Sequence, residues 1–268
     1  MSLFRRVLTK SISRSVLVRP GKRFVFLFHD ISDPDAPQHS NLYSTRVERF
    51  REQVEFLAKK FKLVSLDEIV SEAPDGADRL ASLTFDDGFL SVRDVAYPYL
   101  SSKGIPFAVF VNRAAVENNR LFYGAGSPEI NRGYDRKVFM DEDDVRYLAG
   151  RGVRIGSHSS THRVLSECDE DELREEILGN KSYVESLVGE PVKHLALPFG
   201  KREHYDERVL RFCHSVGHDY VYTTNPTYFS RARPAPDRRP IPRVSFLNES
   251  REEMLFYINR PLLKRIDI

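Results

Sequence analysis

The sequence has few cysteines and almost no excess charge, and each shortage excludes a class of protein. Only Cys168 and Cys213 occur in 268 residues. They are far apart and form no C-x-x-C pair, which excludes a disulfide framework or an all-cysteine metal cluster. One disulfide between them stays open, but we expect two buried thiols. The chain has 41 lysines and arginines against 39 acidic residues. Nucleic-acid-binding domains normally carry a clear basic excess, so we expect no nucleic-acid partner.

Long apolar runs are also missing. No stretch is long enough to span a bilayer, and residues 1–22 contain no signal-peptide core, so we expect a cytoplasmic protein. Before Pro20 the chain has no acidic residue, and its basic residues are Arg5, Arg6, Lys10, Arg14 and Arg19. This pattern suits a helix lying on the anionic inner face of a membrane. The alternative is a frayed terminus or a helix packed against the rest of the chain.

Apolar runs and helical periodicity alternate along the rest of the chain. Strands are expected at 23–29, 80–85, 107–111, 153–156, 194–197, 220–224 and 243–246. Helices are expected at 45–61, 92–102, 141–149, 169–188, 205–215 and 250–259. Alternation of this kind predicts parallel βα units in a barrel or a doubly wound sheet. We therefore expect one α/β domain at 23–268 behind the basic segment 1–22.

Local signals refine two helices and two loops. Thr45 with Glu48, and Asp169 with Glu172, have the spacing of capping boxes at helix starts. The polar segments 112–137 and 225–242 follow strands and should project from the carboxyl rim of the sheet. Their aromatic and arginine side chains suit sugar faces and anionic groups, although ordinary solvated loops have the same composition.

Two adjacent carboxylates follow the expected strand 80–85, in the run Thr84-Phe85-Asp86-Asp87-Gly88. One carboxylate can bind a metal ion while its neighbour takes a proton from water. Gly88 permits a sharp turn directly afterwards. Alone, the motif is equally compatible with a polar turn that caps the next helix.

A second motif, Gly156-Ser157-His158-Ser159-Ser160-Thr161-His162, also follows a strand. Histidines four residues apart meet on one side of a helical turn and can share a divalent ion. Two surface histidines at a helix start are the alternative. Asp87, His158 and His162 together would leave coordination positions open for water and substrate. Such a set favours zinc, and cobalt, nickel or manganese would fit similar ligands.

The run TFDDG, then HSSTH, then Leu197-Pro198-Phe199-Gly200, resembles the NodB-homology polysaccharide deacetylases, carbohydrate esterase family 4. The resemblance extends over residues 24–246, including the first strand VFLFHDI and the late strand at 217–224. It implies a distorted (β/α) barrel that binds zinc or a similar ion. It also implies hydrolysis of N-acetyl groups on glycans.

Carried over residue by residue, the resemblance makes Asp86 the general base and Asp87, His158 and His162 the metal ligands. It also implies that the Pro198-Phe199 segment helps to hold the oxyanion through the backbone amide of Phe199.

The sequence departs from the family pattern at two positions. Many members have an arginine that orients the base where this chain has Ala196. Many also have a late histidine that protonates the leaving amine, and the stretch 243–246 has none. We expect Arg243 to replace the arginine. His29 is the first candidate for the general acid, and His204, His214 and His218 are weaker ones.

The expected substrate is an N-acetylated amino sugar of a bacterial glycan or of its precursor. Without a recognisable signal peptide, a nucleotide-linked or polyprenyl-linked precursor is favoured over finished cell wall. Two alternatives remain open at this point: a deformylase or other linear amide hydrolase that uses the same site, and a degenerate barrel that binds glycan without hydrolysing it.

Overall fold

The computed structural model describes residues 21–36, 43–71, 79–121, 137–229 and 238–263. The basic residues before Pro20 and the middle portions of both long polar loops lie outside these ranges. Among the described helices, none is both long enough and apolar enough to cross a membrane.

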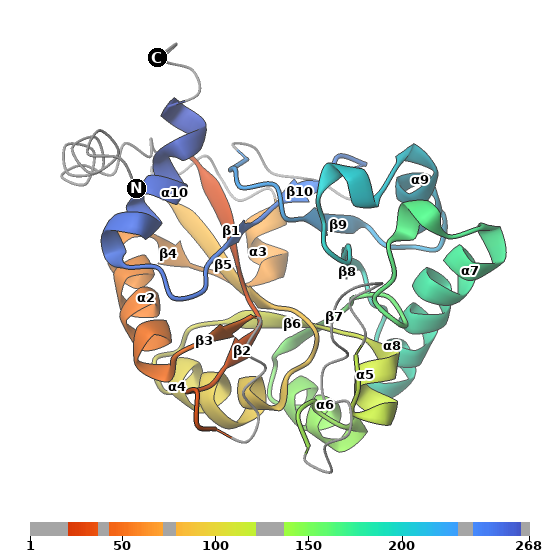
Figure 1. Ribbon diagram of the computed structural model, residues 1–268, viewed down its shortest axis with the longest axis horizontal. Helices are drawn as coiled ribbons and strands as arrows, with labels where there is room; N and C mark the ends of the chain where they lie inside the picture. The colour runs from red at the N-terminus through yellow and green to blue at the C-terminus, as the bar shows by residue number, and fades with distance from the viewer. Residues whose placement is uncertain (1–20, 37–42, 72–78, 122–136, 230–237, 264–268) are drawn as a thin grey trace.

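The centre of the protein is a parallel sheet curved into a nearly closed barrel (Figure 1). Its strand order is β10-β9-β8-β7-β6-β5-β1-β11, with β4 also paired to β5. In that order the strands span Ile241–Pro242, Tyr220–Thr223, His194–Ala196, Arg154–Ser157, Phe107–Val111, Leu80–Phe85, Arg23–Phe28 and Val244–Ser245, and β4 spans Lys62–Leu63. A separate two-stranded sheet pairs β2 and β3, which span Asp30–Ile31 and Ser44–Thr45.

The remaining gap in the barrel wall is spanned by the chain itself. The end strands of the sheet, β10 and β11, are separated in sequence by Arg243 alone. One strand pairs with β9 and the other with β1, so this one residue bridges the gap between the two edges. The side chain of Arg243 is fully buried. The closing point of the barrel therefore places a charged group inside it.

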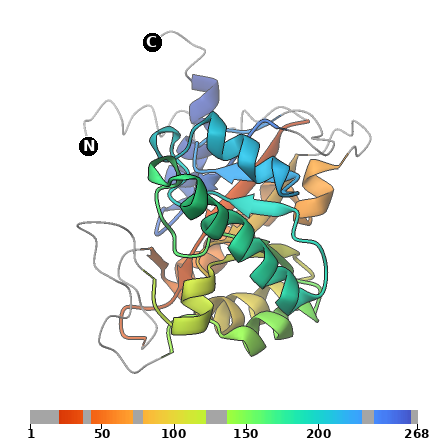
Figure 2. The same ribbon diagram turned by 90° about the vertical axis from the view of Figure 1, so that its right-hand side faces the viewer.

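Helices surround the barrel, as Figures 1 and 2 show from two directions. The α-helices are α2 (Val47–Lys60), α3 (Leu66–Val70), α4 (Tyr97–Ser102), α5 (Arg113–Asn118), α6 (Glu142–Ala149), α7 (Glu170–Arg174), α8 (Asn180–Val188), α9 (Glu207–Ser215) and α10 (Arg251–Leu263). Two π-helical turns, η1 (Val92–Ala96) and η3 (Glu175–Gly179), and two 3-10 turns, η2 (Leu165–Glu167) and η4 (Arg202–His204), complete the set.

Strand β1 shows how the sequence fills both sides of the sheet. Successive side chains of a strand point to opposite faces. Phe24, Phe26 and Phe28 belong to the large cluster that packs under the helices, and Val25 belongs to a second cluster inside the barrel. A strand buried on both faces must be apolar throughout, which is why β1 reads as a continuous apolar run.

The distorted (β/α) barrel expected from the sequence is confirmed, and the cysteines are both buried and unbonded. The capping box expected at Thr45 is wrong. Thr45 instead pairs with Ile31 in the small sheet, and helix α2 begins at Val47. The backbone N–H groups at the start of α2 bond to side chains outside the helix. The N–H of Arg46 donates to Asn248 Oδ1, and the N–H of Val47 donates to Asp33 Oδ1. Long-range pairing outweighs the local capping signal here.

The long helix expected at 169–188 is observed over residues 170–188, with a π-helical turn in its middle. Asp169 and Glu172 form the expected capping box, and the π-helical turn separates α7 from α8. The helix expected at 92–102 likewise begins with a π-helical turn. Such turns insert one residue per turn and often occur at functional sites. Each π-helical turn follows one of the two sequence motifs: η1 follows the motif at 84–88, and η3 follows the motif at 156–162.

Candidate active site

Asp86 and Asp87 lie directly after β5, at the carboxyl end of the barrel. The N–H of Asp86 donates to the carbonyl of Phe28 at 3.0 Å, which extends the pairing of β5 with β1 by one residue. Asp87 and Gly88 then turn sharply, with φ values of 69° and 71°. A Cβ atom on Gly88 would lie 3.2 Å from the side chain of Val111. The turn therefore needs glycine, and it points the two carboxylates in different directions.

His158 and His162 follow β7 in an irregular loop, so the helical turn expected for them is wrong. The loop brings the rings together in another way, through positive φ values of 66° at Ser159 and 61° at His162. The hydroxyl of Ser159 accepts the N–H of His162 at 3.0 Å and holds this turn. The two ring centroids are 5.0 Å apart.

Buried polar residues of helix η3–α8 support the histidine loop from behind. The carboxylate of Glu176 accepts the N–H of Thr161 at 3.0 Å and also its hydroxyl. The side-chain amide of Asn180 donates to Ser157 Oγ at 2.8 Å and to the carbonyl of Val111 at 3.0 Å. Both side chains are at least 95% buried. The π-helical turn at Glu176 thus holds the loop that carries the histidines.

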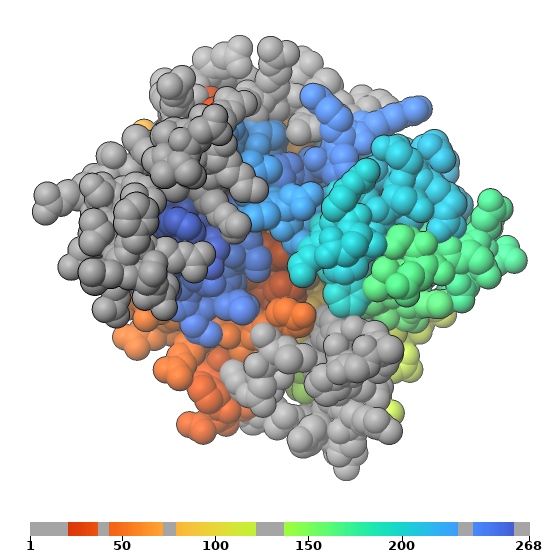
Figure 3. Space-filling model, turned by 45° about the horizontal axis from the view of Figure 1, so that its top comes forward, coloured from red at the N-terminus to blue at the C-terminus, as the bar shows by residue number. Residues whose placement is uncertain are grey.

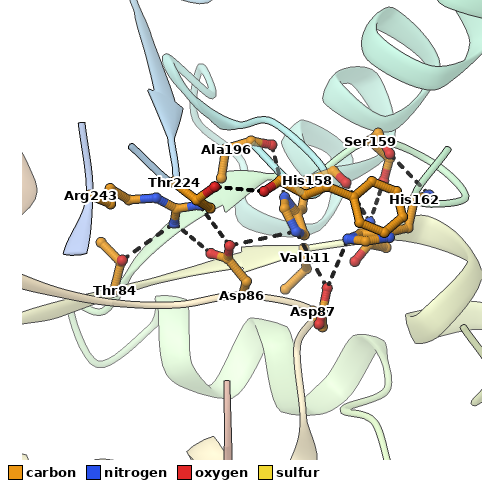
Figure 4. Close-up of polar contacts among 12 residues, drawn as sticks. Thr84, Asp86, Asp87, Val111, His158, Ser159, His162, Ala196, Thr224 and Arg243 are labelled. Atoms are coloured by element: carbon orange, nitrogen blue, oxygen red, sulfur yellow. Dashed lines mark hydrogen bonds and ion pairs between the residues drawn. The ribbon is translucent and has the colours of Figure 1, made fainter. Parts of the chain in front are cut away.

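Asp87, His158 and His162 are brought together at the mouth of the barrel (Figure 4). Each offers one ligand atom, and these atoms lie within 4.8 Å of one another. His158 Nε2 is 3.4 Å and His162 Nε2 is 3.7 Å from Asp87 Oδ1. His158 Nδ1 lies 2.8 Å from the carbonyl of Ala196, which fixes the tautomer that presents Nε2 to the centre. Two imidazoles and a carboxylate in this arrangement fit a divalent ion such as zinc.

The charges and the burial at the centre favour the metal-binding protonation states of Asp87 and His162. Burial would raise the pKa of Asp87, but His158 and His162 outweigh it and hold that pKa below its usual value. Burial lowers the pKa of His162 to about 3. For His158, burial acts in the same direction, but Asp86 and Asp87 outweigh it and raise its pKa. An ionised Asp87 and a neutral His162 are the forms that coordinate a cation.

Asp86 lies between Arg243 and His158, which approach it from opposite sides (Figure 4). The guanidinium of Arg243 donates two parallel hydrogen bonds of 2.7 Å, one to each carboxylate oxygen. Both side chains are at least 98% buried. Burial would raise the pKa of Asp86, but Arg243 and His158 reverse the effect and lower it. Asp86 is therefore a fixed, ionised carboxylate beside the three candidate metal ligands.

Arg243 enters from the gap between β10 and β11 rather than from β8, where Ala196 occupies the position at which the resemblance would have placed an arginine. Its Nε–H also donates to the carbonyl of Thr223 at 3.3 Å. At Ala196 only a backbone carbonyl contributes, and it orients His158 as described above.

The Pro198-Phe199-Gly200 segment forms the wall next to His162. The rings of Phe199 and His162 are 4.5 Å apart. Phe199 has a φ of 58°, and its carbonyl accepts the hydroxyl of Thr224 at 2.7 Å. A Cβ on Gly200 would come within 2.7 Å of the Thr224 backbone nitrogen. The close approach of the segments around Gly200 and Thr224 therefore requires glycine at position 200.

Backbone strain is concentrated at this site. Five non-glycine residues of the described ranges have a positive φ, and four of them are Asp87, Ser159, His162 and Phe199. Such conformations persist only where the surrounding structure enforces them, and they cluster at active sites.

A pocket of about 390 Å³ opens beside the candidate metal centre. Its lining comes from distant parts of the chain: Leu27, His29, Tyr43, Asp86, His158, His162, Phe199, Lys201, His204, Thr224, Ser245 and Leu247. Figure 3 shows the same face, where red-orange, cyan and blue segments meet. Tyr43, Lys201 and Ser245 were not singled out in the sequence. For Lys201 a signal was present, because it directly follows the LPFG motif.

His29 directly follows β1, and β1 pairs with β11 in the stretch 243–246 where the sequence has no histidine. Strands β1 and β11 pair with Leu27 opposite Ser245, and His29 follows Leu27 by two residues. The His29 and Tyr43 rings stack with centroids 4.8 Å apart. Burial lowers the pKa of His29 even though Asp87 and Asp86 act to raise it. His204 also lines the pocket, whereas His214 and His218 do not.

Asp30 fixes the wall formed by His29 and Tyr43. This fully buried carboxylate accepts the hydroxyls of Ser32, Ser44 and Ser91, the last at 2.6 Å. Asp30 directly follows His29, and Ser44 directly follows Tyr43. Ser91 lies three residues after Gly88, so one carboxylate connects the aromatic wall to the loop that carries Asp87.

Comparison with known proteins identifies the family. The model of a family described as "Polysaccharide deacetylase" matches residues 73–221, more than half of the chain. The chain belongs to the polysaccharide deacetylase family. Among curated proteins, this deacetylase-family chain is 22% identical over 155 residues to the putative polysaccharide deacetylase YxkH of Bacillus subtilis. The alignment covers 58% of this chain and 48% of YxkH, so it spans about half the length of that relative.

Solved structures of polysaccharide deacetylases share the fold. The Streptococcus pyogenes deacetylase PplD, solved in complex with acetate, superposes with a TM-score of 0.69 at 20% identity, covering 89% of this chain and 99% of PplD. IcaB from Ammonifex degensii superposes with a TM-score of 0.66 at 19% identity, covering 88% and 96%. These similarities support the same barrel architecture.

Proposed function

We propose that this chain is a metal-dependent hydrolase that removes N-acetyl groups from amino sugars of a bacterial glycan or its precursor. The single observation that carries the proposal is a buried, ionised carboxylate, Asp86, clamped by Arg243 beside the Asp87-His158-His162 set and open to one pocket. Family membership supports a saccharide amide as the substrate class.

Asp87, His158 and His162 would hold the ion, with zinc favoured by the ligand set over cobalt, nickel or manganese. A bound divalent ion polarises the amide carbonyl and lowers the pKa of water. Asp86 then takes the proton of the attacking water, because it is ionised and lies against the same centre. Arg243 orients this base and holds its charge. The backbone amide of Phe199 would donate to the oxyanion as the carbonyl carbon becomes tetrahedral.

His29 is the proposed proton donor to the leaving amine. It lines the pocket and directly follows β1, the strand that pairs with β11 in the stretch 243–246 that has no histidine. Burial keeps the resting side chain neutral, so it can donate only after a proton reaches it. Negative charge that develops on the substrate in the pocket would raise its proton affinity at that stage. His204, on the opposite wall, is the second candidate.

A substrate panel tests the reaction. Purified protein would be stripped with a chelator, reloaded with zinc, and assayed for acetate and formate release from N-acetyl and N-formyl amino sugars. We expect acetate release that chelation abolishes and zinc restores, because the ligand set is complete. Preferred release of formate would change the acyl group but keep the site. A bound ion with no acid released from any substrate would make the chain a glycan-binding barrel and contradict the proposal.

The basic residues 1–22 extend the proposal to a membrane-associated, nucleotide-linked or polyprenyl-linked precursor on the cytoplasmic face. The support is the sequence pattern alone, since residues 1–20 lie outside the described ranges. Deleting residues 1–20 is expected to weaken binding to vesicles that contain phosphatidylglycerol, with no change in turnover of a soluble substrate. Unaltered partitioning would remove the membrane from the proposal.

A further inference from the structure

The pocket contains a cation that the hydrolytic mechanism does not use. Lys201 lines the pocket at its exposed rim, directly after the Pro198-Phe199-Gly200 segment. Within the described ranges it forms no ion pair, whereas the adjacent Arg202 lies over the ring of Tyr205. An unpaired ammonium at the rim of a substrate pocket is available to a ligand.

The charges deeper in the pocket leave this cation uncompensated. Asp86 and Arg243 neutralise each other through their paired hydrogen bonds. A divalent ion held by Asp87 and two neutral histidines would leave one net positive charge at the centre. With Lys201 added, the loaded pocket is positive, which favours a substrate with negative charge.

The residues that line the pocket indicate where the negative charge of a bound substrate would lie. His162 contacts Phe199, and Phe199 in turn contacts His204, with ring centroids 5.0 Å apart. Lys201 belongs to this wall. Burial lowers the pKa of His204, and the positive charge of Lys201 acts in the same direction. The stacked rings of His29 and Tyr43 form another part of the lining. An amide at the metal centre and a sugar ring on the aromatic rings would leave a substituent facing Lys201.

We propose that Lys201 is a specificity-determining residue that binds an anionic substituent, a carboxylate or a phosphate, carried by the N-acylated saccharide. The inference rests on the proposed function, since it names a property of the substrate of that same site. Lys201 takes no part in the hydrolysis itself. It contributes binding energy equally in the ground state and the transition state, so it lowers KM without changing kcat.

Three related probes separate the sources of the charge: methyl N-acetylglucosaminide, which is neutral, the corresponding 6-carboxylate, and N-acetylglucosamine 1-phosphate. Zinc-loaded wild-type protein and the Lys201→Met and Lys201→Arg variants would be compared for KM, kcat and Kd. Arg202→Met is the matched control, because Arg202 is the adjacent exposed cation, does not line the pocket and lies over the ring of Tyr205.

For at least one charged probe, Lys201→Met is expected to raise KM and Kd about tenfold with unchanged kcat, as for the loss of one charge-assisted hydrogen bond. The neutral probe should be unaffected, Lys201→Arg should restore binding, and Arg202→Met should have no effect. The charged probe that responds identifies the substituent as carboxylate or phosphate.

Equal Kd values of wild type and Lys201→Met for both charged probes would overturn the inference, as would an equal effect of Arg202→Met. The proposed function fails separately, by absence of acetate from every probe. In that case the Kd comparison still decides whether Lys201 binds the anion.

Discussion

Replacing Asp86 by asparagine is expected to lower kcat about 1,000-fold while the protein still binds its metal ion, since positioned general bases contribute factors of this order. Asp86 is not part of the ligand set Asp87-His158-His162, so the ion should stay. Asparagine keeps the shape of the side chain but cannot take a proton. Steady-state acetate release, together with zinc content by elemental analysis, measures both properties.

The same substitution should also destabilise the protein, and a double variant separates the two effects. Without the Asp86 carboxylate, the buried guanidinium of Arg243 has lost its ionic partner, which costs about 3–5 kcal/mol in comparable cases. Adding Arg243→Met removes the stranded charge and should recover part of the free energy of unfolding without recovering kcat. Recovery of activity in the double variant would show that Asp86 is not the base.

Replacing Arg243 alone by methionine is expected to lower kcat about 10- to 100-fold with little change in KM. The base keeps its carboxylate but loses the two hydrogen bonds that fix its plane, and misorientation of a catalytic group by a fraction of an ångström is costly. Since the ligand set is untouched, zinc content should not change. Kinetics and elemental analysis on the same preparation check the prediction.

Arg243→Lys is the matched control for position and charge. Lysine keeps the positive charge but cannot make the parallel pair of hydrogen bonds, so kcat should fall between wild type and Arg243→Met. A purely structural role for Arg243 predicts a different pattern, in which activity falls only in proportion to the folded fraction. Unchanged kcat in Arg243→Met would remove Arg243 from the mechanism.

The barrel could be predicted from the sequence because each of its strands is marked by a local pattern of residues. Strands buried on both faces are short apolar runs, and β5 and β6 have the bounds that were predicted at 80–85 and 107–111. The convergence of the Asp86-Asp87 and His158-His162 motifs follows from the same pattern. Both motifs come directly after parallel strands, and the carboxyl ends of those strands meet on one side of the barrel.

The details of the site could not be predicted because they depend on long-range contacts. Thr45 has a correct local capping pattern, yet its pairing with Ile31 decides its structure. The histidine spacing suggests a helical turn, whereas the hydrogen bonds from Glu176 and Asn180 support an irregular loop in which two residues have positive φ values. The contribution of Tyr43 to the pocket has no local signature, because it depends on stacking against His29.

The most direct test of the account is the position of a metal ion in crystals of the zinc-loaded protein. Anomalous diffraction at the zinc edge is predicted to show one ion coordinated by Asp87, His158 and His162. The carboxylate of Asp86 should lie beside the ion, still bonded to Arg243. An ion bound elsewhere, or acetate release by protein shown to hold no metal at these three side chains, would contradict the account.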